Sequence, residues 1–344
     1  MNAKASLEPI AAQKPGKIAA ERGFPRTTSL RSRLFFWIKI LLTVSVLGLL
    51  VITIKPREII AAFQGSYYPL VFVSFILVIP NLGLRALKWG YVLRQVKPTA
   101  SVREILNSLL VGFTFAVVTP GQLGEFGRAF FIAGRPRLEL IGVSFIDKFF
   151  NLLPIILGGS IGLLFLPGLV LDGNTYLFMG CCVLVALLWT FFIVLLLSPR
   201  WVRDLLYAIN VMLPYREKIK ILLSGLDPIR VKQSLTLACL GIAHYAIVIC
   251  QYFLVVQSFQ QVNLFDAFRA TSATLFVKAA LPISIGGLGV GETASVGFFR
   301  LFEVGRAAAF NSSALLFSMN VLLPALVGFL ILLKLRIAPE NSDA

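Results

Sequence analysis

Two stretches rich in glycine and proline interrupt the apolar sequence of this chain, TPGQLGE at residues 119–125 and PISIGGLGVGE at residues 282–292. Proline removes a backbone hydrogen-bond donor and glycine weakens a helix, so both stretches are predicted to break helices. Membranes tolerate broken backbone only where protein buries it or water lines it, and interrupted segments in two halves of a chain point to a transport site. The helix-breaking residues are Pro120, Gly121, Gly124, Pro282, Gly286, Gly287 and Gly289.

The composition indicates a polytopic membrane protein. The 344 residues are 58% hydrophobic and only 14% charged, whereas a soluble domain carries about 25% charged residues. The net charge is +16, and the lysines and arginines flank the apolar runs, as the positive-inside rule describes. We therefore expect contact with anionic membrane lipids, and no nucleic-acid partner.

No cofactor or metal site is predicted. The four cysteines lie within apolar runs at spacings unlike those of a metal site, so we expect no disulfide either. His244 is the only histidine, and it is interpreted as an interior polar residue rather than a ligand. The chain contains no phosphate-loop motif, and Gly287 to Gly291 do not have the spacing of a dinucleotide fingerprint. No catalytic residue is assigned.

The apolar runs predict an all-α integral membrane protein with three parts. Residues 1–33 are expected to form a disordered basic cytoplasmic arm, 34–335 a polytopic membrane domain, and 336–344 a cytoplasmic tail. A span needs about 20 apolar residues. Six full spans are predicted, at residues 34–54, 67–88, 140–166, 175–197, 233–257 and 309–333.

The two broken stretches, 105–133 and 268–303, are predicted to form re-entrant helical hairpins. Basic residues flank the first stretch on both sides, so both of its ends are expected to be cytoplasmic. The second stretch follows a loop without lysine or arginine and is expected to enter from outside. This is the arrangement of an inverted repeat, with both termini in the cytoplasm and the protein in the cell membrane. Under it, Arg269, Arg300 and Arg306 face outside or lie in the interior.

Two further features concern the edges of the bilayer. Residues 201–213 have apolar side chains at helical spacing, which predicts either an amphipathic helix on the cytoplasmic surface or a packed connector. Tyr67, Tyr68, Trp89 and Tyr91 lie near the ends of spans and are interpreted as interfacial anchors.

Glu125 and Glu292 directly follow the two breaks. An acidic residue in the first turn of a helix gains about 0.3–1 kcal/mol, but a charge at the centre of a bilayer costs about 2.5–3.5 kcal/mol on insertion scales. Each carboxylate must therefore be paired, hydrated or protonated, and each of these states requires a polar interior. A functional role is the hypothesis for both glutamates, and helix capping is the alternative.

We expect these glutamates to belong to a charged network near the middle of the membrane. Arg128 lies three residues after Glu125 and can pair with it, whereas the adjacent Asp147 and Lys148 need partners on other segments. The proposed substrate-binding network has three acids and three bases, so its net charge is near zero. An anionic head group would bind to its cations and to free N–H groups at the starts of the half-helices. The alternative is an ion-pair cluster that only holds the helices together. The members of the network are Glu125, Arg128, Asp147, Lys148, Lys278 and Glu292.

Both motifs resemble those of the lysylphosphatidylglycerol synthase transmembrane-region family. The matching residues are Thr119-Pro120-Gly121-x-x-Gly124-Glu125-x-x-Arg128 and Leu281-Pro282-Ile283-Ser284-x-Gly286-Gly287-Leu288-Gly289-Val290-x-Glu292. The likeness covers about residues 34–335, and Asp147-Lys148 stand where relatives often carry an acid-base pair. The resemblance implies a flippase-like domain that moves lipid between leaflets. It also implies a stand-alone member, because no room remains after the last span for the soluble synthase domain of bifunctional relatives.

The sequence therefore predicts translocation of a phospholipid or lipid-linked head group, and not an enzyme. Two alternatives stay open. One is a membrane-embedded enzyme that synthesises an aminoacyl- or glycosyl-lipid and uses Glu125 or Glu292 as acid or base. The other is an accessory subunit of a lipid-synthesising enzyme, which would then be its partner. No oligomeric state follows from the sequence.

Overall fold

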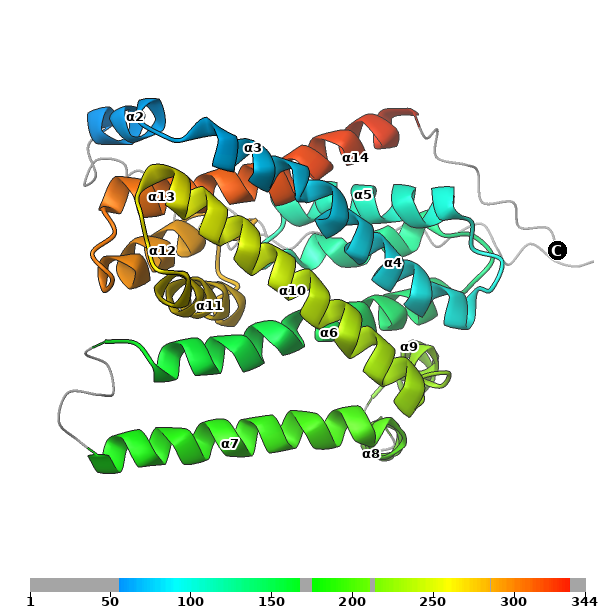
Figure 1. Cartoon of the computed structure of the whole chain (residues 1–344). Coiled ribbons are helices and arrows are strands. Elements are labelled where there is room, and N and C mark those ends of the chain that lie inside the picture. The colour runs from blue at the N-terminus through cyan, green and yellow to red at the C-terminus, as the bar shows by residue number, and fades with distance from the viewer. Residues whose placement is uncertain (1–55, 168–174, 211–213, 285, 335–344) are drawn as a thin grey trace, which may run out of the picture. The chain divides into compact units, whose positions relative to one another are not determined.

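The computed structural model describes residues 56–167, 175–210, 214–284 and 286–334. These residues form helices and connecting loops, with no β-strand among them (Figure 1). The prediction of an all-α protein is confirmed. The longer helices are α4 (Val78–Val96), α5 (Val102–Val118), α6 (Arg137–Leu164), α7 (Thr175–Leu197), α10 (Val231–Phe259) and α11 (Leu264–Ala280). The shorter ones are α2 (Pro56–Gln64), α3 (Tyr68–Ile76), α8 (Pro199–Asn210), α9 (Arg216–Leu223), α12 (Val290–Arg300), α13 (Arg306–Phe317) and α14 (Leu323–Lys334), with 3₁₀ segments η1 (Leu123–Phe131) and η2 (Ser224–Leu226) and a π-helical segment, η3 (Ser318–Leu322).

Within the described residues, 5 helical segments are long and apolar enough to cross a membrane. They correspond to five of the six predicted spans. Three predicted parts lie outside the described residues: the basic arm 1–33, the span 34–54 and the tail 336–344. Residue 335, the last of the predicted membrane domain, lies outside them as well. The five segments are Tyr68–Val96, Arg137–Leu164, Thr175–Leu197, Val231–Phe259 and Arg306–Lys334.

The first broken stretch is a helical hairpin. Ser101 caps the start of helix α5, because its hydroxyl accepts a hydrogen bond from the Glu104 N–H, and the helix ends at Val118, directly before the break. The chain then turns back, and η1 packs along α5 in the opposite direction. The two arms are so close that a Cβ on Gly124 would lie 2.1 Å from the Phe115 carbonyl oxygen.

The second broken stretch forms a matching hairpin from α11 and α12. Helix α11 ends at Ala280, and α12 begins at Val290 after a loop that includes Gly286, Gly287 and Gly289, all with positive φ. The predicted helix breaks are therefore confirmed at both stretches. The two arms pack against each other, and α12 continues through a tight turn into α13.

The tips of the two hairpins touch. The Gly121 N–H donates to the Ser284 carbonyl at 3.1 Å, and the Gly286 N–H donates to the Thr119 carbonyl at 3.3 Å. The Gln122 side chain adds a third bond, from Nε2 to the Gly286 carbonyl at 3.2 Å. Each broken loop thus supplies hydrogen-bond partners for the other, which the backbone of a buried loop requires.

The bases of the hairpins lie at opposite ends of α6. Near the start of α6, Lys97 Nζ donates to the Ala133 carbonyl at 2.8 Å and closes the base of the α5–η1 hairpin. At the other end of α6, Arg269 on the second hairpin donates from Nη1 to the Phe165 carbonyl at 2.8 Å. Since α6 crosses the molecule between these two contacts, the hairpins approach each other from opposite sides.

Helices α6 and α10 hold this arrangement together. They cross closely because Gly241 leaves space for the Phe150 carbonyl oxygen, which a Cβ there would approach to 2.4 Å. Helix α7 packs beside α6 and α10 (Figure 1), and most of its apolar surface is exposed, as expected for a helix that faces lipid.

Two predictions about the bilayer edges can be compared with the structure. Helix α8 leaves Trp201, Leu205 and Ile209 exposed, which fits the amphipathic surface helix better than the packed connector. Trp89 is not an interfacial anchor, because it is fully buried and donates from Nε1 to the Ser108 hydroxyl at 3.0 Å. Helix α4 continues to Val96, so Trp89 lies inside the helix rather than at the end of a span.

Candidate functional site

Glu125 lies between two cations from different helices. Its Oε1 is 3.0 Å from Arg85 Nη2 on α4, and its Oε2 is 2.7 Å from Lys148 Nζ on α6. The three side chains are only 11–20% exposed. The carboxylate is therefore paired, which is one of the three states that the sequence allowed, but neither Arg85 nor Lys148 was predicted as its partner.

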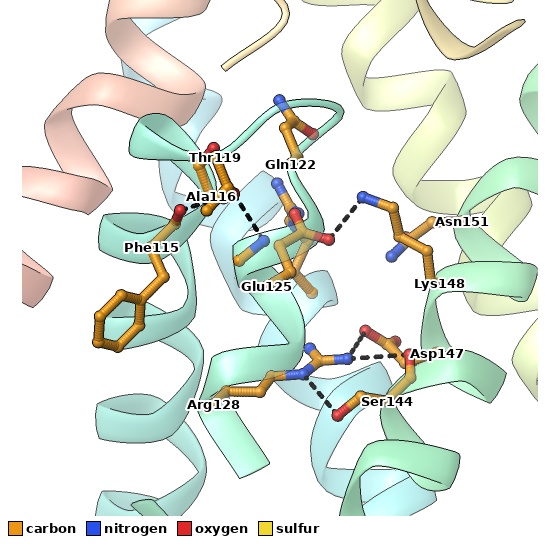
Figure 2. A network of polar contacts seen from close by, with 12 residues as sticks. Phe115, Ala116, Thr119, Gln122, Glu125, Arg128, Ser144, Asp147, Lys148 and Asn151 are labelled. Carbon is orange, nitrogen blue, oxygen red and sulfur yellow. Dashed lines mark hydrogen bonds and ion pairs between the residues drawn. The ribbon is translucent and has the colours of Figure 1, made fainter. Parts of the chain in front are cut away.

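Asp147, which directly precedes Lys148 on α6, forms a second cluster (Figure 2). Its Oδ2 accepts from Arg128 Nη2 at 2.8 Å, and its Oδ1 lies 3.4 Å from Lys88 Nζ. Arg128 also donates to the hydroxyl and the carbonyl of Ser144, and its guanidinium stacks 3.7 Å from the centroid of the Trp89 ring. Lys88 donates to Asn151 as well. The buried charge of Arg128 is tolerable because its hydrogen bonds are made in this way, whereas Asp147 Oδ1 has the ion-pair contact with Lys88 but no hydrogen bond.

Arg128 therefore pairs with Asp147 and not with Glu125, which corrects the prediction from sequence. The reason is the direction of the neighbouring helix. Segment η1 runs antiparallel to α6, so Arg128 faces Ser144 and Asp147, while Glu125, one turn earlier, faces Lys148 (Figure 2). Arg128 and Glu125 therefore each pair with a residue of α6 rather than with each other.

Arg85 and Lys88 were counted among the basic residues that flank the first broken stretch on its cytoplasmic side, at the end of the predicted span 67–88, but the structure places them in the interior. Both lie within α4, and Lys88 is 1% exposed. A signal was present in the sequence: Asn81, Arg85 and Lys88 are spaced four and three residues apart, which places them on one face of a helix. A polar stripe of this kind indicates that the helix continues with that face turned inward.

Glu292 occupies the capping position that was the alternative for it. Its Oε2 accepts from the Gly289 N–H at 2.6 Å, and its Oε1 accepts from the Ser313 hydroxyl at 3.3 Å. Lys278 lies next to the same loop: a Cβ on Gly287 would be 2.7 Å from Lys278 Cε. Within the described chain, no carboxylate lies within ion-pairing distance of Lys278.

The N–H groups at the starts of the half-helices are largely used within the protein. In the first hairpin, the N–H groups of Leu123, Gly124 and Glu125 donate to Pro120, the Thr119 hydroxyl and Gln122. In the second, those of Gly289 and Gly291 donate to Glu292 and Gly287. The expectation that these groups are free to bind a phosphate is wrong for these residues, because the loops fold back on themselves.

A cavity of about 580 Å³ lies where the hairpin tips meet α4, α6 and α10. Gly121, Gln122, Pro282 and Gly287 from the tips line it. Most of the remaining wall is apolar, with side chains such as Phe126, Phe145 and Phe149. The charged residues of the lining are Arg85, Glu125, Lys148 and Lys278.

The predicted network is thus divided by the structure. Glu125, Lys148 and Lys278 line the cavity, whereas Arg128, Asp147 and Glu292 are buried behind its wall. The expected near-zero charge is also incorrect. With Arg85 and Lys88 included, five bases accompany three acids, so the formal excess is two positive charges.

Comparison with known proteins identifies the family of the chain. No curated protein matches it. The family model described as the lysylphosphatidylglycerol synthase TM region matches residues 36–328, which includes both hairpins and the whole cavity. The described helices, the multi-pass membrane character and the sequence motifs agree with this match. The chain belongs to the lysylphosphatidylglycerol synthase TM-region family.

Proposed function

We propose that this protein moves an anionic lipid head group, a phospholipid or lipid-linked phosphate, from one leaflet of the cell membrane to the other. The observation that carries the proposal is the cavity at the meeting point of the two hairpins. Three of its charged lining residues are cations and only one is an anion. A cation excess among partly buried side chains attracts a phosphate.

The hairpins supply a route for the head group. We propose that both are re-entrant, one from each side of the membrane, and that the span predicted at 34–54 completes six full crossings with both termini in the cytoplasm. Their opposite approach supports this topology, since the tips then separate the two sides near the midplane. The head group would cross between the tips while the acyl chains stay in the lipid.

The roles of the two glutamates favour a carrier over an enzyme. Glu125 is held by two cations, and Glu292 caps the Gly289 N–H. An acid or base catalyst has to exchange protons with substrate, and these carboxylates are already engaged by cations and backbone. Lys148 and Lys278, in contrast, reach the cavity with charges that a phosphate can share.

The test is transport by purified protein in liposomes that contain phosphatidylglycerol labelled on its acyl chain. We expect rapid loss of label from the outer leaflet, measured with a membrane-impermeant quencher, and no new lipid product. The substitution Lys278→Met keeps the length of the side chain but removes its charge. A charge-assisted hydrogen bond contributes about 1.5–3 kcal/mol, so we expect transport to slow about tenfold or more.

The exposed Lys218 provides the matched control, and Lys218→Met is expected to transport at the normal rate. Movement of label no faster than in protein-free liposomes would contradict the proposal. So would an unchanged rate for Lys278→Met in a protein that is otherwise active. The appearance of a chemically altered lipid would favour the enzyme instead.

A further inference from the structure

A second group of polar side chains lies at the same cavity. It consists of amide side chains and one histidine. Asn81 of α4, His244 of α10 and Asn320 of the π-helical segment η3 all line it. Gln251, fully buried on α10, joins them. Segments of π-helix are rare and frequently occur at functional sites.

The backbone carbonyl of Ser74 fixes the direction of the hydrogen bonds in this group. A carbonyl can only accept, so the amide nitrogen of Gln251 must be the atom that lies 3.1 Å from it. The Gln251 oxygen is then the acceptor for Asn81 Nδ2 at 2.9 Å and for Asn320 Nδ2 at 3.0 Å. Because Asn81 donates from its nitrogen, its oxygen faces the histidine.

This order determines which nitrogen of His244 carries the proton. His244 Nε2 lies 3.2 Å from Asn81 Oδ1, which can only accept. Nε2 must therefore be the protonated nitrogen, and in the neutral ring Nδ1 is an acceptor. In the described part of the chain no hydrogen bond uses Nδ1, and the residue lines the cavity.

We propose that His244 Nδ1 accepts a hydrogen bond from a hydroxyl of the transported head group, and that the substrate is a phosphodiester lipid with a polyol head group such as glycerol or a sugar alcohol. This inference rests on the proposed function. The cations Arg85, Lys148 and Lys278 bind the phosphate, and the histidine recognises the neutral, hydroxylated part. An amine head group could also donate to Nδ1, but its positive charge would be repelled by the three cations.

The experiment compares two lipids that differ only in hydroxyl groups. Phosphatidylglycerol and phosphatidylethanol have the same phosphodiester charge, and only the former carries hydroxyls. Leaving the acceptor in a binding site without its partner costs about 1–3 kcal/mol, so we expect the protein to move phosphatidylglycerol about tenfold faster than phosphatidylethanol. Both lipids are labelled on the acyl chain and measured in the same liposomes.

Two substitutions of His244 separate recognition from structure. His244→Gln places an amide nitrogen where Nε2 lies, so it keeps the donor to Asn81 but loses the acceptor at Nδ1. His244→Asn places an amide oxygen close to Nδ1 but cannot reach Asn81. We expect His244→Gln to lower transport of phosphatidylglycerol to the phosphatidylethanol rate without changing the latter. We expect His244→Asn to retain the preference and to melt at a lower temperature.

The possible results discriminate between this inference and the function on which it rests. Equal rates for the two lipids in the unmodified protein would overturn the inference and leave anionic lipid transport intact. The same holds if His244→Gln keeps the preference, or if both substitutions slow both lipids equally, which a purely structural role predicts. Transport of neither lipid would overturn the proposed function itself, and the inference with it.

Discussion

Arg128 is held on several sides at once, and this makes its neighbourhood the most sensitive point of the charged cluster. It pairs with Asp147, donates to Ser144 and stacks on Trp89. Only a planar guanidinium can combine a carboxylate contact with stacking on an aromatic ring. Since Arg128 does not line the cavity, its effect on transport would be exerted through the positions of Asp147 and of η1.

At this residue we predict that Arg128→Ala destabilises the protein by about 3–5 kcal/mol, because it leaves Asp147 buried with Lys88 alone. Arg128→Lys should recover only part of this loss. Arg135→Ala is the control, since the Arg135 side chain is 42% exposed and its ion pair with Glu139 is long, at 3.9 Å. Such pairs contribute about 0–1 kcal/mol. Thermal melting in detergent micelles measures all three, and equal melting temperatures for the two alanine variants would contradict the prediction.

Among the elements, the two hairpins depend on each other through a very small contact. Gly121 has φ +60°, and a Cβ there would lie 2.5 Å from Pro282 Cβ on the opposite tip. Glycine is required at this position for two reasons: the left-handed backbone and the close approach of the other hairpin. The hydrogen bonds between the two tips therefore require a residue at 121 that has a left-handed backbone and no side chain.

The substitution Gly121→Ala should therefore separate the tips as well as strain the backbone. Gly134→Ala is the matched control, because Gly134 also has positive φ, at +78°, but no atom lies within 4 Å of its added Cβ. We expect the control to lose only the backbone term, about 1–2 kcal/mol, and Gly121→Ala to lose a further 1–3 kcal/mol or so from overpacking.

Thermal melting and the liposome assay together read out this difference. The rate of lipid transport should change in Gly121→Ala and stay normal in Gly134→Ala. If the two variants behave alike in both assays, the contact between the tips does not matter for the protein.

The elements also show where sequence reasoning succeeds and where it fails. Helix breaks at Pro120 and Pro282 could be predicted because proline and glycine act on their own backbone, whatever surrounds them. Hydropathy placed the end of the span at Lys88, eight residues before the end of α4 at Val96. A hydropathy scale gives every lysine the same value, so it cannot distinguish a buried, paired lysine from one in a loop. Likewise, the partner of Arg128 depends on the direction of α6, which is a property of the tertiary structure.

On the scale of the whole molecule, the basic residues after the first hairpin and the opposite approach of the second hairpin together define one topology. The base of the first hairpin, near Ala133, is followed by Arg135 and Arg137, whereas the turn that ends the second, near Glu303, lies at the other end of α6. By the positive-inside rule the first base should be cytoplasmic, and the opposite approach of the hairpins then places the second base, although Arg300 and Arg306 flank it, on the outside.

We predict that single cysteines at these two positions are labelled from opposite sides. Ala133→Cys and Glu303→Cys are introduced separately into a chain whose native cysteines (Cys181, Cys182, Cys239 and Cys250) are replaced by serine or alanine. Both target side chains are exposed. A membrane-impermeant maleimide added to intact cells should modify Glu303→Cys alone, and Ala133→Cys should react only after the membrane is opened. Transport activity of each variant shows that the fold is retained. Reaction of both cysteines from the same side would mean that the hairpins enter from one face, and an alternating path for the head group between the two tips would then be excluded.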